Sequence, residues 1–130
     1  MKIRMQRNSV RLRLTQTELQ HFGTSGRVEE TVSFGLHPAT RLTYALERNA
    51  DIGTCCASFG NGTIRLQIPG PLADEWVNTG RVGIECRQWL DEQTTLHLLV
   101  EKDFRCLDGG RAEENADAFP NPLANHPKNC

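Results

Sequence analysis

Ser9-Val10-Arg11-Leu12-Arg13-Leu14 is the stretch of sequence that decides the fold, because the chain repeats its pattern 54 residues later as Thr63-Ile64-Arg65-Leu66-Gln67-Ile68. Apolar and polar residues alternate in both stretches, as they do in a β-strand with one buried face. The first arginine and the central leucine are identical in the two copies. The shift of 54 residues therefore predicts two related halves.

The likeness extends beyond these two strands without a gap. Further matches at the same shift are Phe22 with Trp76, Gly26-Arg27-Val28 with Gly80-Arg81-Val82, Leu42 with Leu96, and Glu47 with Glu101. The apolar positions keep their alternation in both copies, so the inward and outward side chains are predicted to correspond. We interpret the chain as an internal duplication, with halves at about 1–50 and 53–104.

Each half is predicted to have the order β-β-α-β-β. Asn61-Gly62 is a preferred two-residue hairpin turn between alternating segments, and Arg7-Asn8 holds the matching place. Thr15 and Glu18 form a capping box for a helix, and Leu72 and Trp76 give the second helix an apolar stripe. The expected strands are 2–6, 9–14, 27–34, 41–48, 53–59, 63–68, 81–87 and 94–101.

Short consecutive strands joined by tight turns favour antiparallel pairing. The predicted fold class is therefore α+β and mostly antiparallel β. The halves would form a pseudo-twofold barrel or a strongly curved sheet, with two short helices on one side. A barrel is the preferred reading, because closure removes exposed edges. We place one domain at 1–107 and an acidic, proline-containing C-terminal tail at 108–130.

Composition excludes several classes of function. The chain has 130 residues, the length of one ordinary domain, with 15 basic and 16 acidic residues and a net charge of −1. This balance argues against a nucleic-acid partner. No apolar run is long enough to cross a membrane, and no signal peptide is evident. Five cysteines without a CxxC motif indicate reduced thiols and a cytoplasmic location.

Outward-facing polar residues on the predicted strands form the candidate binding surface. Arginine's planar fork suits phosphate and carboxylate groups, so a small anionic ligand or a protein partner is the leading reading. An ordinary solvated sheet face is the simpler interpretation of the same pattern. The candidate ligand-binding residues are Arg4, Arg11, Arg13, Arg65, His97, Glu47 and Glu101.

Two other functions compete with this reading. A metal-dependent phosphohydrolase of the triphosphate-tunnel type would use Glu47, Glu85 and Glu101, but the ExExK signature is missing from the first strand, residues 2–6. A structural or regulatory homodimer without a small ligand is the third reading. We find no serine elbow, P-loop or dinucleotide motif, and we assign no catalytic residue and no cofactor.

A zinc site is the remaining metal candidate in the sequence. Cys106, His126 and Cys130 could supply three ligands, but no fourth ligand is compelling and Cys106 lies far from the other two. We therefore assign no metal site. The protein is more readily understood as a non-enzymatic binding domain.

Three segments resemble a family of small uncharacterised bacterial proteins. They are Met1-Lys2-Ile3-Arg4 with Asn8-Ser9-Val10-Arg11-Leu12-Arg13-Leu14-Thr15-Gln16, Leu99-Val100-Glu101-Lys102-Asp103-Phe104 followed by Cys106-Leu107, and Asp117 with Phe119-Pro120-Asn121-Pro122. The resemblance covers the chain up to Pro122. It implies no activity, cofactor or catalytic residue.

Overall fold

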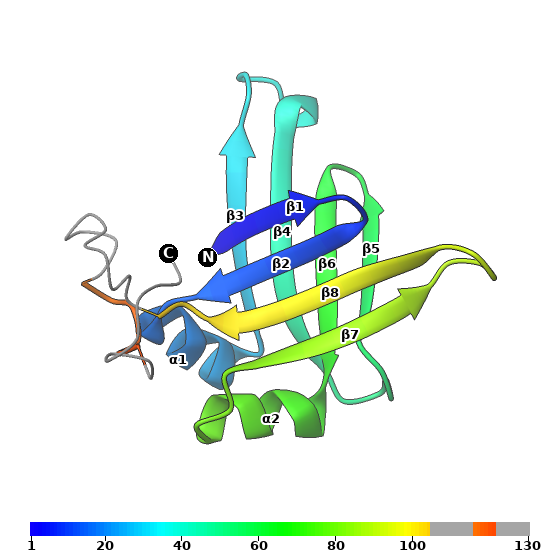
Figure 1. The fold of residues 1–130 in the computed structure, drawn as a ribbon. Helices are drawn as coiled ribbons and strands as arrows, with labels where there is room; N and C mark the ends of the chain where they lie inside the picture. The colour runs from blue at the N-terminus through cyan, green and yellow to red at the C-terminus, as the bar shows by residue number, and fades with distance from the viewer. Residues whose placement is uncertain (105–115, 122–130) are drawn as a thin grey trace.

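The computed structural model describes residues 1–104 and 116–121. In this part of the chain, strands form two four-stranded sheets and two α-helices lie together at one end (Figure 1). The strands are β1 (Lys2–Gln6), β2 (Ser9–Leu14), β3 (Arg27–Ser33), β4 (Arg41–Asn49), β5 (Cys56–Gly60), β6 (Thr63–Pro69), β7 (Gly83–Trp89) and β8 (Thr95–Lys102). The helices are α1 (Gln16–Ser25), α2 (Gly70–Asn78) and a short 3-10 helix, Pro38–Thr40.

Each sheet combines one hairpin from each half of the chain. Sheet A has the order β1-β2-β8-β7, and sheet B has the order β3-β4-β6-β5. The hairpins are antiparallel as expected, but the central pairs β2–β8 and β4–β6 are parallel. The expectation of antiparallel pairing was wrong there, because β2 and β6 lead into helices rather than turns. The second strand that pairs with β2 or with β6 therefore comes from the other half of the chain.

The shift of 54 residues also relates the pairings in the two sheets. Ser9 lies opposite His97 in sheet A, and Thr63 lies opposite Thr43 in sheet B. Adding 54 to Ser9 gives Thr63, and subtracting 54 from His97 gives Thr43. The β1–β2 and β5–β6 hairpins correspond in the same way. The halves thus occupy equivalent places, while their common origin stays a prediction.

One stretch departs from the ungapped alignment. Val28 in β3 is buried, but Val82, its expected counterpart, is 46% exposed. Ile84 fills the corresponding core position instead. β7 begins two residues later than the shift of 54 from β3 would place it, and the β7–β8 loop at 90–94 is two residues shorter than the β3–β4 loop at 34–40. These two changes cancel, so β8 returns to the original shift.

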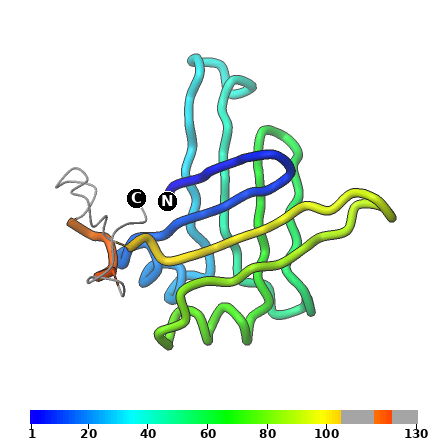
Figure 2. The backbone as a smooth tube through the Cα atoms, viewed as in Figure 1, coloured from blue at the N-terminus to red at the C-terminus, as the bar shows by residue number. Residues whose placement is uncertain are grey.

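The two sheets do not close into a barrel. They pack face to face with their strands crossing at a steep angle, and β1, β7, β3 and β5 remain sheet edges (Figures 1 and 2). The alternation correctly identified the inward residues, and these apolar side chains of both sheets pack against one another in one core. The buried core includes Val10, Leu12, Leu14, Leu46, Leu66, Ile68, Ile84, Leu98 and Val100. The α+β class is confirmed, and the closed barrel is wrong.

Each helix carries the chain from one sheet to the other. The capping box predicted for α1 is present, since Thr15 accepts from the Glu18 amide and Glu18 accepts from the Thr15 amide. Gly26, with φ of 77°, ends α1 in the left-handed conformation that glycine favours. Phe22 and Trp76 point from the helices into the core. Together the helices cover one end of the sandwich.

The neighbouring edges β5 and β7 are joined by side chains rather than by a strand ladder. A disulfide links Cys55 to Cys86, with a Cα–Cα distance of 6.1 Å. The expectation of reduced thiols was wrong for this pair, because the fold brings together two cysteines that are 31 residues apart. Cys56 is a free cysteine, and Cys106 and Cys130 lie outside the described residues.

Residues 116–121 pack back onto the end of β8. Ala118 is buried, and the Phe119 ring meets the Phe104 ring edge-on with centroids 5.8 Å apart. The Lys102 ammonium lies 5.7 Å from the centroid of the Phe119 ring. The domain boundary at 107/108 and the zinc candidates Cys106, His126 and Cys130 lie outside the described residues.

Candidate functional site

The outward surface of sheet A carries the largest group of predicted site residues. Because side chains alternate along a strand, the register aligns outward residues in rows across the sheet. One row runs from Arg4 through Arg11 and Leu99 to Glu85. We call this surface the sheet A face; its outward residues are Lys2, Arg4, Gln6, Ser9, Arg11, Arg13, Glu85, Arg87, Trp89, Thr95, His97, Leu99 and Glu101.

The seven candidate ligand-binding residues do not form one surface. Sheet A holds Arg4, Arg11, Arg13, His97 and Glu101, whereas sheet B holds Arg65 and Glu47. The alternation placed all seven outside the core, but the two sheets of a sandwich have outer faces on opposite sides. Arg65 and Glu47 therefore cannot share a small ligand with Arg11.

Both sheets carry a corresponding ion pair on their outer surface. Glu101 pairs with Arg11 and, at 2.9 Å, with the Arg13 Nε atom. Glu47 pairs with Arg65 at 3.2 Å. The shift of 54 relates Arg11 to Arg65 and Glu47 to Glu101, so each pair joins the two halves.

Glu47 has two further partners on sheet B. Its carboxylate lies 3.1 Å from the Arg27 Nε atom and accepts a hydrogen bond of 3.1 Å from the Gln67 amide. Gln67 corresponds to Arg13, so this neighbour of the glutamate is neutral on one sheet and charged on the other. The outer surfaces of the two sheets therefore have corresponding Arg–Glu ion pairs but differ in charge at the position of Arg13 and Gln67.

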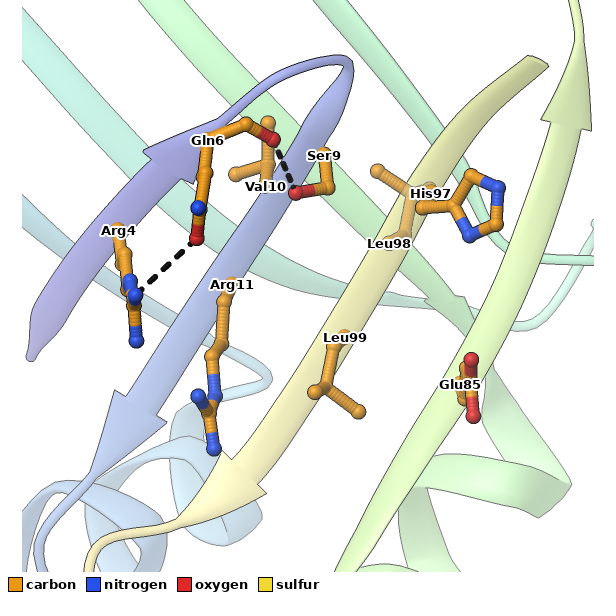
Figure 3. Close-up of a pocket in the computed structure, with 9 residues that line it drawn as sticks. All are labelled: Arg4, Gln6, Ser9, Val10, Arg11, Glu85, His97, Leu98 and Leu99. Atoms are coloured by element: carbon orange, nitrogen blue, oxygen red, sulfur yellow. Dashed lines mark hydrogen bonds between the residues drawn. The ribbon is translucent and has the colours of Figure 1, made fainter. Parts of the chain in front are cut away.

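A shallow pocket of about 240 Å³ opens on the sheet A face (Figure 3). Arg4 and Arg11 extend side by side from neighbouring strands along one side of it, while Glu85 lies on the other side beyond Leu99. Arg4 donates a hydrogen bond of 3.1 Å to the Gln6 side-chain oxygen. The lining residues are Arg4, Gln6, Ser9, Val10, Arg11, Glu85, His97, Leu98 and Leu99.

Sequence reasoning did not single out Gln6, Ser9 and Leu99 as site residues. Their types carry no distinctive chemistry, and only the register shows that they border the arginines. The sequence signal for Leu99 was its place between two inward residues, Leu98 and Val100. That alternation puts an apolar side chain in the middle of an otherwise polar row.

The acidic residues invoked for a tunnel enzyme do not converge. Glu85 and Glu101 are on sheet A, and Glu47 is on sheet B with the core between them. The described side chains that form the core between the sheets are apolar, which does not fit a polar tunnel. Within residues 1–104 and 116–121, no three His, Cys, Asp or Glu side chains cluster as metal ligands do.

Fold and surface together define a class: a small α+β sandwich of two mixed sheets that carries an arginine-bearing pocket on one outer face. The sequence model of a family of unknown function (DUF7009) matches residues 1–123. The chain belongs to this family. No curated protein and no solved structure matches it. No helix in the described part of the chain has the length and apolar character needed to span a membrane.

Proposed function

We propose that the sheet A face binds a small molecule with a single anionic group, a carboxylate or a phosphate, at Arg4 and Arg11. The observation that carries this proposal is the register, which places the two arginines directly opposite each other on β1 and β2. Both border the same pocket. Like charges opposite each other destabilise a bare sheet, so an anion between them would relieve that repulsion.

Arg4 is the more available of the two cations. Its hydrogen bond within the described residues goes to the neutral Gln6 side chain, and no carboxylate lies within ion-pair distance there. A guanidinium presents two parallel N–H groups to a carboxylate or phosphate, which a lysine cannot do. The geometry thus supports a bidentate contact at Arg4.

Arg11 must exchange one partner for another when a ligand binds. Its carboxylate partner, Glu101, is also held by Arg13. Glu101 would therefore keep a cationic neighbour if Arg11 turned toward an anion. This sharing lowers the cost of releasing Arg11.

Glu85 limits the charge that the pocket can accept. It lies on the same row, separated from Arg11 by Leu99 on β8. A polyanion that reached across the row would bring a second negative group toward this carboxylate. We therefore propose a ligand with one anionic group and an apolar portion over Leu99, rather than a triphosphate.

The test compares two arginines that correspond in the two sheets. Inorganic phosphate and acetate are titrated into the wild type and into Arg4→Ala, Arg11→Ala and Arg65→Ala variants, followed by the NMR signals of the arginine Nε–H groups. We expect saturable shifts at Arg4 and Arg11 and at least fivefold weaker binding in their variants, with Arg65→Ala like the wild type. The absence of saturable shifts, or an equal loss in Arg65→Ala, would overturn the proposal.

The homodimer stays a separate prediction. Light scattering at increasing protein concentration tests it, because a dimer would double the measured mass. Its outcome does not depend on the arginine variants.

A further inference from the structure

A second cavity, widely open to solvent, lies between the two sheets at the end of the sandwich away from the helices. It has a volume of about 560 Å³ and is formed by both sheets. The helices follow the last residues of β2 and β6, whereas the cavity lies near the first residues of these strands. Its lining residues are Met5, Val10, Leu42, Ala57, Ser58, Phe59, Ile64, Gln88, Leu90 and Leu96.

The cavity exists because only one end of the sandwich is covered by helices. At that end Phe22 and Trp76 fill the core. At the other end the strands turn back in hairpins, and among the described residues only the short 3-10 helix Pro38–Thr40 follows a strand there, with no α-helix to cover the core. As a result Met5, Phe59 and Leu90 remain 56%, 71% and 56% exposed.

The chemistry of the lining selects an uncharged occupant. None of the ten lining side chains is ionisable. The Gln88 amide is already engaged at both ends, accepting from the Ala57 N–H at 2.6 Å and donating to the Ala57 carbonyl at 3.1 Å. A charged group placed against this lining would lose part of its hydration and find no ionisable partner among the lining side chains, which is unfavourable.

The size of the cavity favours a small molecule over a protein surface. Small-molecule sites are apolar hollows of about 300–1,000 Å³. A stable protein interface uses about 20–30 residues on each side, more than the ten residues that line this cavity. The Gln88–Ala57 hydrogen bonds also fix one wall in advance, and a pre-formed wall lowers the cost of binding.

We propose that this cavity binds a small uncharged apolar molecule, such as a medium-length alkyl chain or an aromatic ring system. Val10 borders both sites, but the arginine pocket opens on the sheet A face and this cavity lies between the sheets, so neither proposal depends on the other. Met5 at the mouth can adapt to different ligand shapes, because its side chain is unbranched and flexible.

Binding is tested with N-phenyl-1-naphthylamine, an uncharged dye whose fluorescence rises in apolar surroundings. We expect saturable binding of one dye per chain, and displacement by 1-decanol at concentrations at least tenfold lower than those needed with decanoate. Binding that does not saturate would overturn the proposal, and so would displacement by decanoate equal to or stronger than that by 1-decanol.

Three variants locate the site. Phe59→Glu and Leu90→Glu place a charge at the mouth, and Leu36→Glu is the matched control because Leu36 is 98% exposed and lies outside the lining. We expect at least tenfold weaker dye binding in the first two variants and no change in the control. Equal weakening in all three would overturn the assignment.

A titration of the wild type keeps the test independent of how the variants fold. The methyl signals of Leu42, Ile64 and Leu96 are expected to shift with added dye, and those of Leu99 on the sheet A face are expected not to. The reverse pattern would overturn the proposal, as would a dimer by light scattering in which the same methyl groups are protected without dye.

Discussion

The ring of Phe22 in α1 lies edge-on to the ring of Trp76 in α2, with centroids 5.9 Å apart and planes at 61°. These two residues are related by the shift of 54 residues, so equivalent positions of the two halves meet each other. Both are almost completely buried. The contact joins the halves at the end of the sandwich where both helices lie.

The first prediction concerns this contact. Phe22→Ala should lower the free energy of unfolding by about 3–5 kcal/mol, because it removes a large buried ring and leaves a cavity. His21→Ala changes the neighbouring exposed residue of the same helix and should alter stability by less than about 0.5 kcal/mol. Urea unfolding of both variants measures the difference. Similar values would show that the ring contact does not support the core.

The second prediction concerns the disulfide between the sheet edges. Replacing both Cys55 and Cys86 by serine should lower the free energy of unfolding by about 3–4 kcal/mol, since the bond closes a loop in the unfolded chain. A thiol reductant should destabilise the wild type by a similar amount and leave the double variant unchanged. The Cys56→Ser variant is the control, and the reductant should destabilise it as much as it destabilises the wild type.

The sequence predicts those features of the fold that depend on residues close together in the chain. Alternation along Ser9–Leu14 and Thr63–Pro69 identifies strands and their inward faces, because side-chain direction depends on neighbouring residues alone. Capping and turn residues are equally local, and Thr15 and Asn61-Gly62 were interpreted correctly. Local signals do not say which strands become neighbours.

Strand partners depend on contacts across the whole chain. The parallel pairing of Leu12 with Val100 joins residues that are 88 positions apart in the sequence. Nothing in the alternation of either strand selects this partner, since any strand with an apolar face could pack there. For this reason the sequence predicted a barrel, whereas in the structure each half contributes one hairpin to each of two open sheets.

The candidate site shows the same limit. Arg11 and Arg65 were expected to be symmetry-related, and the matching register and ion pairs agree with that relation. Arg11 and Arg65 nevertheless lie on different surfaces, because corresponding residues of the two halves belong to different sheets. Alternation tells which side chains point outward but not which outward surface they share.

The third prediction uses the corresponding glutamates. Glu101→Gln should strengthen phosphate binding at the sheet A face about two- to fivefold, because Arg11 loses a competing carboxylate worth up to about 1 kcal/mol. Glu47→Gln makes the same change on sheet B and should leave that affinity unchanged. Titration of the Arg11 Nε–H signal measures both. An increase in both variants would indicate a general effect of net charge.

The fourth prediction concerns the link between Gln88 and Ala57. Gln88→Met keeps the shape of the side chain but loses two hydrogen bonds, and it should lower the free energy of unfolding by about 1–3 kcal/mol. The Ala57 amide should exchange with deuterium faster than in the wild type. Gln93→Met, in the exposed β7–β8 loop, serves as the control and should change neither quantity.

The fifth prediction concerns Asp117, which holds residues 116–121 against the start of α1. Its carboxylate accepts from the Thr17 amide at 3.3 Å, and its backbone carbonyl accepts from the Gln16 amide at 3.0 Å. A hydrogen bond from the Thr15 side chain, followed by those from Thr17, lowers the pKa of this carboxyl below its ordinary value of 3.8. A negative charge at a helix N-terminus is also favourable.

Because the folded pKa of Asp117 is depressed, its contribution is fully present above pH 3.8 and is lost as the pH falls through the lower folded value. The Thr17 amide signal should therefore titrate with a midpoint below 3.8 in the wild type. Asp117→Asn should abolish that titration at Thr17 and increase the exchange rate of the Gln16 amide at neutral pH. A midpoint at or above 3.8 would mean that the carboxylate does not hold the segment. Loss of the titration with an unchanged Gln16 exchange rate would assign the anchoring to Ala118 and Phe119 instead.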